Sequence, residues 1–171
     1  MTETVRHSAR FRLDGLSGID MITYALEVYR DRIALVSSFG AESAVLLHMA
    51  AQVSKDFPVV FLDTGKLFAV TYDYQADLAA HLGLTNVRTV HPETVDIKTE
   101  DRSGALWRND PDRCCAVRKT WPLARALEGF DAWITGRKKF QNIDRKRVSG
   151  VQIQDDRLVL SPLLDWPQSD L

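Results

Sequence analysis

Cysteine is scarce in this chain, and the scarcity limits what its thiols can do. The only two cysteines among 171 residues are neighbours, Cys114 and Cys115, in the stretch DPDRCCAVRK. Consecutive Cα atoms lie about 3.8 Å apart, which is less than the roughly 4.4–6.8 Å that a disulfide usually spans. We therefore expect two free thiols, which either ligate a common metal group or pack as small buried side chains.

Long apolar runs and an excess of one charge are also absent. No stretch approaches the roughly 18 apolar residues of a membrane span, and the N-terminal MTETVRHSARFRL lacks the apolar core of a secretory signal. The formal net charge of −1 gives no support to nucleic-acid binding. We expect a cytoplasmic protein that binds neither membranes nor nucleic acid, in a compartment where disulfides are rare.

Three common ligand-binding signatures are missing as well. The chain has neither the Gly-x-x-x-x-Gly-Lys-Ser/Thr loop of P-loop nucleotidases nor the Gly-x-Gly-x-x-Gly of dinucleotide-binding domains. Adjacent cysteines also differ from the Cys-x₂₋₄-Cys spacing that is typical of zinc sites. These absences argue against those nucleotide-binding classes and against zinc.

What the chain does contain is an alternation of apolar runs with segments of helical periodicity. We expect strands at 32–39, 58–63, 86–92 and 131–136, and helices at 16–30, 42–56, 65–83 and 114–129. Gly83 suits a helix end, and Pro122 predicts a break or kink in the last helix. Because the strands lack polar alternation and helices separate them, we predict an α/β fold with a doubly wound, mostly parallel sheet covered on both faces.

The 171 residues suffice for a single domain, in which 1–31 forms an N-terminal helical segment. The stretch 151–163 has the pattern of a hairpin that turns at Asp155–Asp156. The final DWPQSDL resembles a helix start, with Asp165 as N-cap and Pro167 in the first turn. Since one turn of helix is not stable alone, we expect the chain to be part of a longer protein.

Polar turns follow three of the expected strands, and the carboxyl ends of such strands form the usual ligand-binding edge. SSFGAES (37–43) opens a helix, whose backbone N–H groups and serine hydroxyls suit an anion. LDTGKLF (62–68) ends the second strand, and TGRKKFQNIDRKR (135–147) carries six basic residues against one acid. Together they predict phosphate or sulfate binding. Taken singly, each segment also has a simpler explanation. The first fits an ordinary turn, the second a helix cap by Asp63 or Thr64, and the third a solvated charged face.

Five segments resemble, in order, the adenylyl-sulfate and phosphoadenylyl-sulfate reductase family: SSFGAES, LDTGKLF with TYDY, RCCAVRK, TGRKKFQ and SPLLDW. The resemblance spans about residues 32–166 and implies an adenine nucleotide α-hydrolase-like domain with a PP-loop. In the iron–sulfur branch of that family, a Cys-Cys pair and a later Cys-x-x-Cys hold a [4Fe–4S] cluster. Cys114 and Cys115 thus resemble two cluster ligands, and that branch prefers adenylyl sulfate to its 3′-phosphorylated form.

The resemblance also implies a set of site residues. Lys119 would lie between cluster and substrate sulfate and offset the charge of both. The implied substrate-binding residues are Ser37, Ser38, Phe39, Gly40, Glu42, Ser43, Asp63, Thr64, Gly65, Arg137 and Lys138.

The family reaction, as the resemblance implies it, needs a further cysteine. A thiolate near the C-terminus attacks the sulfate sulfur and releases AMP, and thioredoxin then reduces the enzyme S-sulfonate to give sulfite. This chain has no Cys-x-x-Cys and no C-terminal Glu-Cys-Gly type segment, so two cluster ligands and the nucleophile are missing. We therefore expect a C-terminally truncated adenylyl-sulfate reductase that does not turn over by itself.

Several alternatives stay open at this point. The chain could derive from a phosphoadenylyl-sulfate reductase, or from an ATP pyrophosphatase-type ligase or tRNA-thiolating enzyme of the same fold. The last two usually carry a Ser-Gly-Gly-x-Asp-Ser type loop, in place of which this chain has SSFGAES. A nucleotide-binding remnant without catalysis is the non-enzymatic alternative. Assembly into a homo-oligomer is compatible with each of them.

Overall fold

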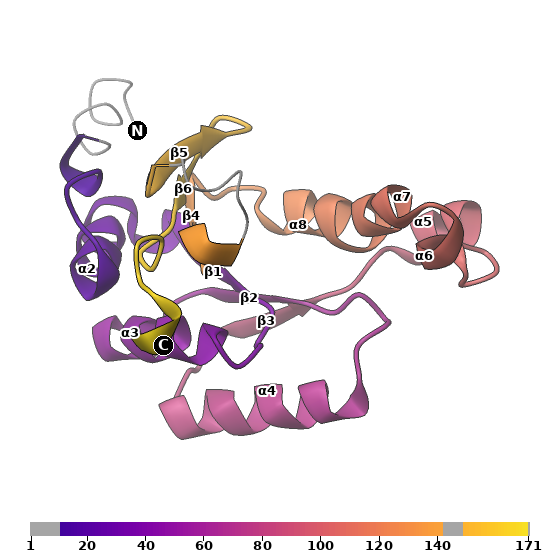
Figure 1. Cartoon of the computed structure of the whole chain (residues 1–171), viewed down its shortest axis with the longest axis horizontal. Helices are drawn as coiled ribbons and strands as arrows, with labels where there is room; N and C mark the ends of the chain where they lie inside the picture. The colour runs from indigo at the N-terminus through magenta and orange to yellow at the C-terminus, as the bar shows by residue number, and fades with distance from the viewer. Residues whose placement is uncertain (1–10, 142–148, 171) are drawn as a thin grey trace.

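One six-stranded sheet forms the centre of the protein, with the strand order β3-β2-β1-β4-β6-β5 (Figure 1). The computed structural model describes residues 11–141 and 149–170. Within them the neighbouring strands run parallel, except that β5 and β6 pair antiparallel. The strands are β1 (Ile33–Ser37), β2 (Val59–Leu62), β3 (Val87–Val90), β4 (Ala132–Thr135), β5 (Val151–Gln154) and β6 (Arg157–Leu160). The chain builds outward from β1 in both directions, which confirms the predicted doubly wound, mostly parallel α/β sheet.

The helices lie at the sheet and on an arm that extends from it (Figure 1). Those near the sheet are α2 (Gly18–Tyr29), α3 (Ser43–Val53) and α4 (Ala69–Leu82). Those of the arm are α5 (Thr94–Glu100), α6 (Leu106–Asn109), α7 (Pro111–Cys115) and α8 (Trp121–Ala126). The sequence did not predict α5 and α6, because neither buries an apolar stripe: no residue of α5 or α6 is buried.

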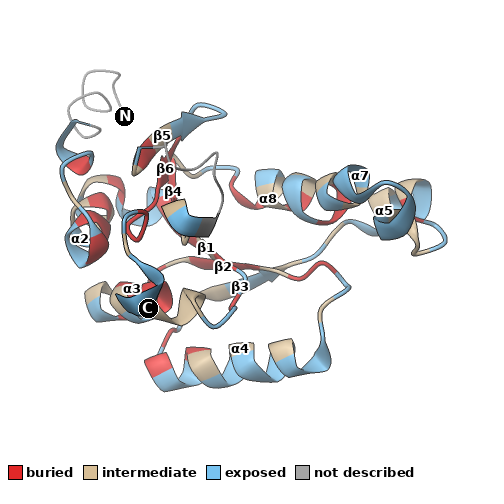
Figure 2. Cartoon of the chain, in the orientation of Figure 1, coloured by how far each residue is buried: buried red, intermediate tan, exposed pale blue. Residues whose placement is uncertain are grey.

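The two faces of the sheet are covered unequally. On one face, strand residues such as Ile33 and Leu35 join the main core with side chains of α2, α3 and α4. On the other face, a smaller cluster joins Ala34 and Trp133 to Ala126 of α8. Buried residues concentrate in the strands and on the inner sides of α2 and α3, whereas α4 is largely exposed (Figure 2). In β1, β2 and β4 apolar residues on both sides of the strand explain the lack of polar alternation. In β3, by contrast, Arg88 and Thr89 are exposed.

The predicted hairpin is present, and its turn carries a testable consequence. Asp155 and Asp156 connect β5 to β6 with φ of 49° and 59°, a left-handed conformation that two-residue hairpin turns require and that favours Asn-Gly. We expect D155N/D156G to stabilise the fold by about 0.5–1 kcal/mol, raising Tm by about 1–4 °C. Thermal unfolding measures this, with Asp156→Ala as the control that should lower Tm. A Tm of D155N/D156G equal to or below that of the unaltered chain would contradict the left-handed conformation of this turn.

The helix predicted at 65–83 begins four residues later than expected, at Ala69. Asp63 and Thr64 do not cap it. Their side chains instead accept hydrogen bonds from the amides of Gly65 (2.8 Å) and Lys66 (3.2 Å), which holds the backbone in a non-helical turn. The predicted end is confirmed, since Gly83 closes α4 with φ of 67°.

The helix predicted at 114–129 spans Pro111 to Ala126 and contains one widened turn, η2 (Ala116–Thr120). It begins earlier than expected because Asp110 caps it, accepting a hydrogen bond from the amide of Arg113. Within η2, the amide of Trp121 donates to the carbonyl of Ala116, five residues back. Pro122, which follows directly, has no N–H and conflicts with a normal α-helical turn. The predicted kink is thus a widened turn.

The helix start predicted for the last segment is wrong in detail. Asp165 does not cap a helix; its carboxylate forms an ion pair with Lys139. Pro167 is followed by a single 3-10 turn, Gln168–Asp170. The first ten residues of the predicted N-terminal segment, and Leu171, lie outside the described residues.

Candidate functional site

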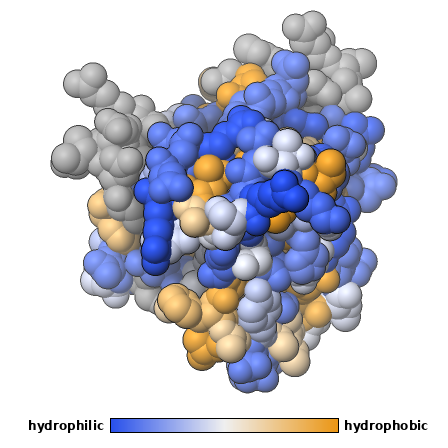
Figure 3. Space-filling model, turned by 90° about the vertical axis from the view of Figure 1, so that its right-hand side faces the viewer, coloured by the Kyte–Doolittle hydropathy of each residue, from blue (hydrophilic) through white to orange (hydrophobic). Residues whose placement is uncertain are grey.

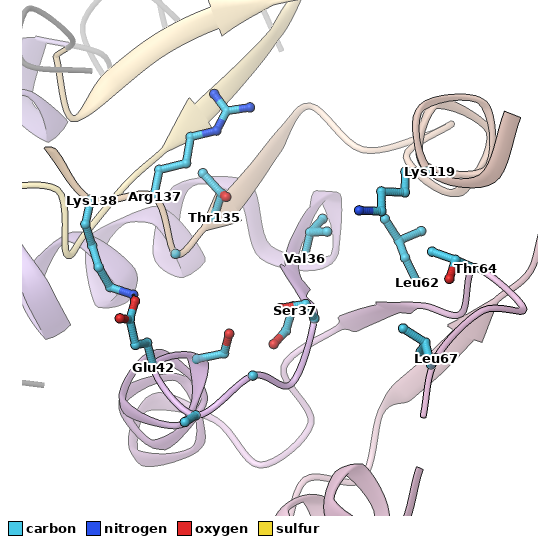
Figure 4. Close-up of a pocket in the computed structure, with 15 residues that line it drawn as sticks. Val36, Ser37, Glu42, Leu62, Thr64, Leu67, Lys119, Thr135, Arg137 and Lys138 are labelled. Atoms are coloured by element: carbon cyan, nitrogen blue, oxygen red, sulfur yellow. The ribbon is translucent and has the colours of Figure 1, made fainter. Parts of the chain in front are cut away.

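A pocket of about 610 Å³ lies where β1, β2 and β4 end (Figure 4). This is the carboxyl edge of the parallel strands, where open α/β sheets bind their ligands, and the volume suits a small organic molecule. The lining comes from the turns after these strands and from the arm: Val36, Ser37, Ser38, Gly40, Ala41, Glu42, Ser43, Leu62, Thr64, Leu67, Lys119, Thr135, Gly136, Arg137 and Lys138.

Most of the residues singled out from the sequence meet at this pocket. Those that line it are Ser37, Ser38, Gly40, Glu42, Ser43, Thr64, Lys119, Arg137 and Lys138. Phe39, Asp63 and Gly65 do not line it, and Cys114 and Cys115 do not either. Segments distant in sequence therefore converge on one cavity, while the binding of a substrate by these residues stays a prediction.

Phe39 anchors the loop that forms one wall of the pocket. Its side chain is 1% exposed and packs edge-on against Phe61, with ring centroids 5.3 Å apart. Its backbone has φ of 51°, and its amide donates to the Ser37 hydroxyl at 3.0 Å. Because the ring points into the core, Phe39 holds the loop in place rather than presenting its side chain to a ligand.

The same loop leads directly into α3, and Ser43, the first residue of that helix, lines the pocket. The start of a helix carries partial positive charge. In α3 the first two amides already have partners, since those of Ser43 and Ala44 donate to the carbonyls of Gly40 and Ala41 at 2.8 and 3.2 Å. An anion in the pocket would therefore lie beside a favourable helix end.

Three basic side chains reach the pocket, and one of them is neutralised there. Lys138 is 2% exposed, and its Nζ lies 2.9 Å from Glu42 Oε2 (Figure 4). The Arg137 guanidinium lies over the ring of Trp133, 5.6 Å from its centroid. Lys119 projects from the arm toward Leu62 (Figure 4). The lining thus holds three cations, Lys119, Arg137 and Lys138, and one anion, Glu42. The basic residues 145–147 lie outside the described residues.

Asp63 does not line the pocket, but its side chain organises the turn after β2. Besides the Gly65 amide, its carboxylate accepts a hydrogen bond from the Tyr72 hydroxyl at 2.9 Å and lies 3.3 Å from His91 Nδ1. The hydrogen bond to Asp63, together with desolvation and the carboxylate charge, raises the pKa of Tyr72. The sequence predicted no role for His91, whose contact with Asp63 depends on the β2–β3 pairing.

Arg118 is the main residue of the site region that sequence analysis missed. It is 7% exposed, and its Nε and Nη2 donate to Asp101 Oδ2 at 3.0 and 2.6 Å. Its Nη1 donates to the Thr64 carbonyl at 2.7 Å. Burial alone would raise the pKa of Asp101, but the Leu106 amide, the Arg118 guanidinium and the charge of Lys66 together hold that pKa below its ordinary value. Nothing in the local pattern around RKT distinguishes a buried arginine from an exposed one.

The two cysteines lie on α7 of the arm, Cys114 partly buried and Cys115 exposed. Within residues 11–141 and 149–170, no three His, Cys, Asp or Glu side chains are grouped so that they could hold a metal ion. A [4Fe–4S] cluster takes four thiolates, and the chain has two cysteines. These residues alone therefore do not fit the cluster that the resemblance implies.

This mismatch predicts the result of reconstitution. Anaerobic incubation of the chain with iron, sulfide and a thiol should leave well below one [4Fe–4S] equivalent after desalting, because two thiolates leave half of the iron sites without protein ligands. Iron analysis and the visible absorption of the desalted chain measure this, with C114S/C115S as the matched control. A stable cubane spectrum near stoichiometric iron, absent from the control, would contradict it.

Within the described residues, none of the helices combines the length and the apolar character needed to cross a bilayer.

Comparison with known proteins identifies the family. Residues 32–171 match the model of the phosphoadenosine phosphosulfate reductase domain. Over 146 residues the chain is 46% identical to an adenosine 5′-phosphosulfate reductase of Mesorhizobium japonicum, covering 85% of this chain and 58% of the relative. It is 36% identical to a phosphoadenosine 5′-phosphosulfate reductase of Alkalilimnicola ehrlichii, over 96% of this chain and 69% of that relative.

The fold agrees with a solved structure of the same kind. The crystal structure of phosphoadenylyl-sulfate reductase from Candida auris, a phosphate complex, superposes with a TM-score of 0.77 at 23% identity, covering 99% of this chain and 83% of that one. The chain spans 58% of the Mesorhizobium japonicum relative and 66% of an adenosine 5′-phosphosulfate reductase of a Chelativorans species. By its match over residues 32–171, the chain belongs to the phosphoadenosine phosphosulfate reductase domain family, with the adenine nucleotide α-hydrolase-like fold expected of it.

Proposed function

We propose that this chain is the nucleotide-binding part of a cytoplasmic, thioredoxin-dependent adenylyl-sulfate reductase, and that its pocket binds adenylyl sulfate. One observation carries the proposal: the loop before α3, the turn at Thr64, Lys119 and Arg137 line a single pocket at the carboxyl edge of the sheet. All four belong to segments that resemble this reductase family. A pocket lined by three cations and one anion, beside the positive end of α3, suits the phosphosulfate group.

In the proposed complex, each wall has a separate task. Apolar Val36, Leu62 and Leu67 offer contacts to an adenine ring. The start of α3 and the hydroxyl of Ser43 receive the α-phosphate. Lys119 and Arg137 receive the sulfate and offset the charge that builds on the departing phosphate oxygen. The Lys138–Glu42 pair is already satisfied, so it shapes the pocket wall between loop and β4 without adding net charge.

The proposed reaction needs a cysteine thiolate that this chain does not supply. That thiolate attacks sulfur, an S–S bond forms, the bond from sulfur to the phosphate oxygen breaks, and AMP leaves with the electron pair. The dithiol of thioredoxin then reduces the S-sulfonate, which releases sulfite and leaves thioredoxin as a disulfide. Cys114 and Cys115 stay cluster-ligand candidates for a longer protein, and neither lines the pocket. We therefore expect no sulfite release by this chain alone.

The preference for adenylyl sulfate over its 3′-phosphorylated form rests on the cysteine pair and on the 46% and 42% identical relatives named adenosine 5′-phosphosulfate reductase. A calorimetric titration of the chain with adenylyl sulfate, its 3′-phosphorylated form and ATP tests the proposal. Selective binding of adenylyl sulfate is the expected result. Tighter binding of the 3′-phosphorylated form would reverse the substrate preference, and selective binding of ATP would instead support a pyrophosphatase-type ligase.

A further inference from the structure

Two walls of the pocket come from parts of the chain that are far apart in sequence. Thr64 belongs to the turn after β2, whereas Lys119 lies in the widened turn η2 of the arm (Figures 1 and 4). The arm extends away from the sheet, and the face that it presents is largely hydrophilic, with apolar side chains gathered below it at the height of α4 (Figure 3). Besides the apolar cluster that joins α8 to the sheet, a polar contact between the arm and the Thr64 turn helps to set the spacing of the two walls.

Arg118 makes that contact. Its guanidinium is buried between the two walls and donates to the Thr64 carbonyl at 2.7 Å. The next residue of the turn, Gly65, has φ of 68°, and a Cβ there would lie 3.4 Å from Arg118 Nη1. The turn thus approaches the guanidinium closely, with no side chain between them. A second tie runs from Lys66 Nζ to the Gly104 carbonyl at 2.9 Å, between the same turn and the α5–α6 loop.

Asp101 holds the guanidinium in its orientation. It accepts two donors of Arg118 through Oδ2, and its Oδ1 accepts the Leu106 amide at 2.9 Å. Arginine is suited to this place, because its planar fork donates to a carboxylate on one edge and to a carbonyl on the other. A lysine could keep the charge beside Asp101 but could not serve both acceptors.

The widened turn then transmits the position of Arg118 to Lys119. The two residues are consecutive, so their side chains leave the helix in different directions. Arg118 is directed inward and buried, while Lys119 is exposed and lines the pocket. Fixing the one side chain against Thr64 therefore fixes the direction in which the other is presented.

We propose that Arg118 is a positioning residue, which sets the distance between Thr64 and Lys119 across the pocket and thereby controls the affinity for the sulfonucleotide through Lys119. This inference rests on the proposed function, because the ligand is the one proposed above. Arg118 itself does not line the pocket and acts through its neighbour.

The ligand-binding test is a double-mutant cycle measured by calorimetric titration with adenylyl sulfate. We expect Arg118→Lys to raise Kd about 10-fold and Lys119→Ala to raise it about 30-fold, with R118K/K119A within threefold of K119A alone. If the two increases in Kd multiply in R118K/K119A, the proposal is overturned, because Arg118 would then affect binding without acting through Lys119. Arg108→Met, on an exposed arginine of the same arm that stacks on Trp107, should leave Kd unchanged.

A second measurement needs no ligand. Amide hydrogen exchange of R118K should be at least 10-fold faster at Gly65 and Lys66, with the amides of β1 and β4 unchanged. If R118K proves too unstable to measure, Lys66→Met loosens the same turn through an exposed side chain and should speed the same two amides. Unchanged exchange at both amides would overturn the proposal. Failure of the unaltered chain to bind adenylyl sulfate would instead count against the proposed function, since the exchange result reports the Arg118 link by itself.

Discussion

Replacing Asp101 with asparagine is expected to lower the free energy of unfolding by about 3–5 kcal/mol, the usual cost of breaking a buried ion pair from one side. The carboxylate is fully buried, and the substitution leaves the Arg118 guanidinium buried without its counterion. Chemical denaturation of the variant and of the unaltered chain measures the difference. Glu128→Ala, at an exposed position of the loop after α8, is the control and should change stability by less than about 0.5 kcal/mol.

The same ion pair predicts how stability depends on pH. The pKa of Asp101 is lower in the folded chain than the ordinary value of 3.8. The ionised carboxylate therefore contributes stability that is fully present above that ordinary value and is lost as the pH falls through the lower, folded pKa. Below about pH 4, the unaltered chain should lose stability more steeply than D101N does. Parallel curves for the two proteins across this range would show that Asp101 is not held ionised by Arg118.

The central sheet could be predicted from the sequence because its signals are local. All four strands predicted at 32–39, 58–63, 86–92 and 131–136 are present, each shortened at its ends. The hairpin turn at Asp155–Asp156 is also confirmed. Apolar runs mark β1, β2 and β4, because both faces of the sheet are covered there and no polar residue is needed at alternate positions. The signal is weaker in β3, where Arg88 and Thr89 are exposed.

The convergence of three loops on one pocket was predictable for a related reason. Parallel strands end at one edge, so turns such as 37–43 and 62–68 must meet there whatever their side chains do. Which side chains face the cavity was not predictable in the same way. Phe39 lies within the binding loop by sequence, yet its positive φ turns the ring into the core against Phe61.

The features that escaped prediction depend on long-range contacts. Asp101 and Arg118 are both charged residues, and charged side chains are normally exposed. Their burial follows from the way the arm packs on the Thr64 turn, which no local period encodes. The start of α4 was misplaced for a similar reason, because the side chains of Asp63 and Thr64 bond to the next amides of the turn rather than to a helix.

Reversing the charge of Lys119 is expected to have the largest effect on ligand binding. Lys119→Glu replaces the exposed cation that points into the pocket with an anion, and the proposed ligand carries its negative charge on adjoining phosphate and sulfate groups. We expect the Kd for adenylyl sulfate to rise at least about 100-fold, which corresponds to about 2.7 kcal/mol. Since Lys119 is exposed, thermal unfolding should show little change in Tm.

A matched control separates a local effect of this charge from a change in the overall charge of the protein. Lys98 is exposed on α5 of the same arm and does not line the pocket. Lys98→Glu changes the net charge by the same amount, but at physiological salt, where charges are screened beyond about 8 Å, its effect on Kd should stay below about threefold. An equal increase in Kd in the two variants would show that Lys119 acts only through the net charge of the protein. A loss confined to Lys119→Glu would show that its ammonium contacts the bound phosphosulfate or lies next to it.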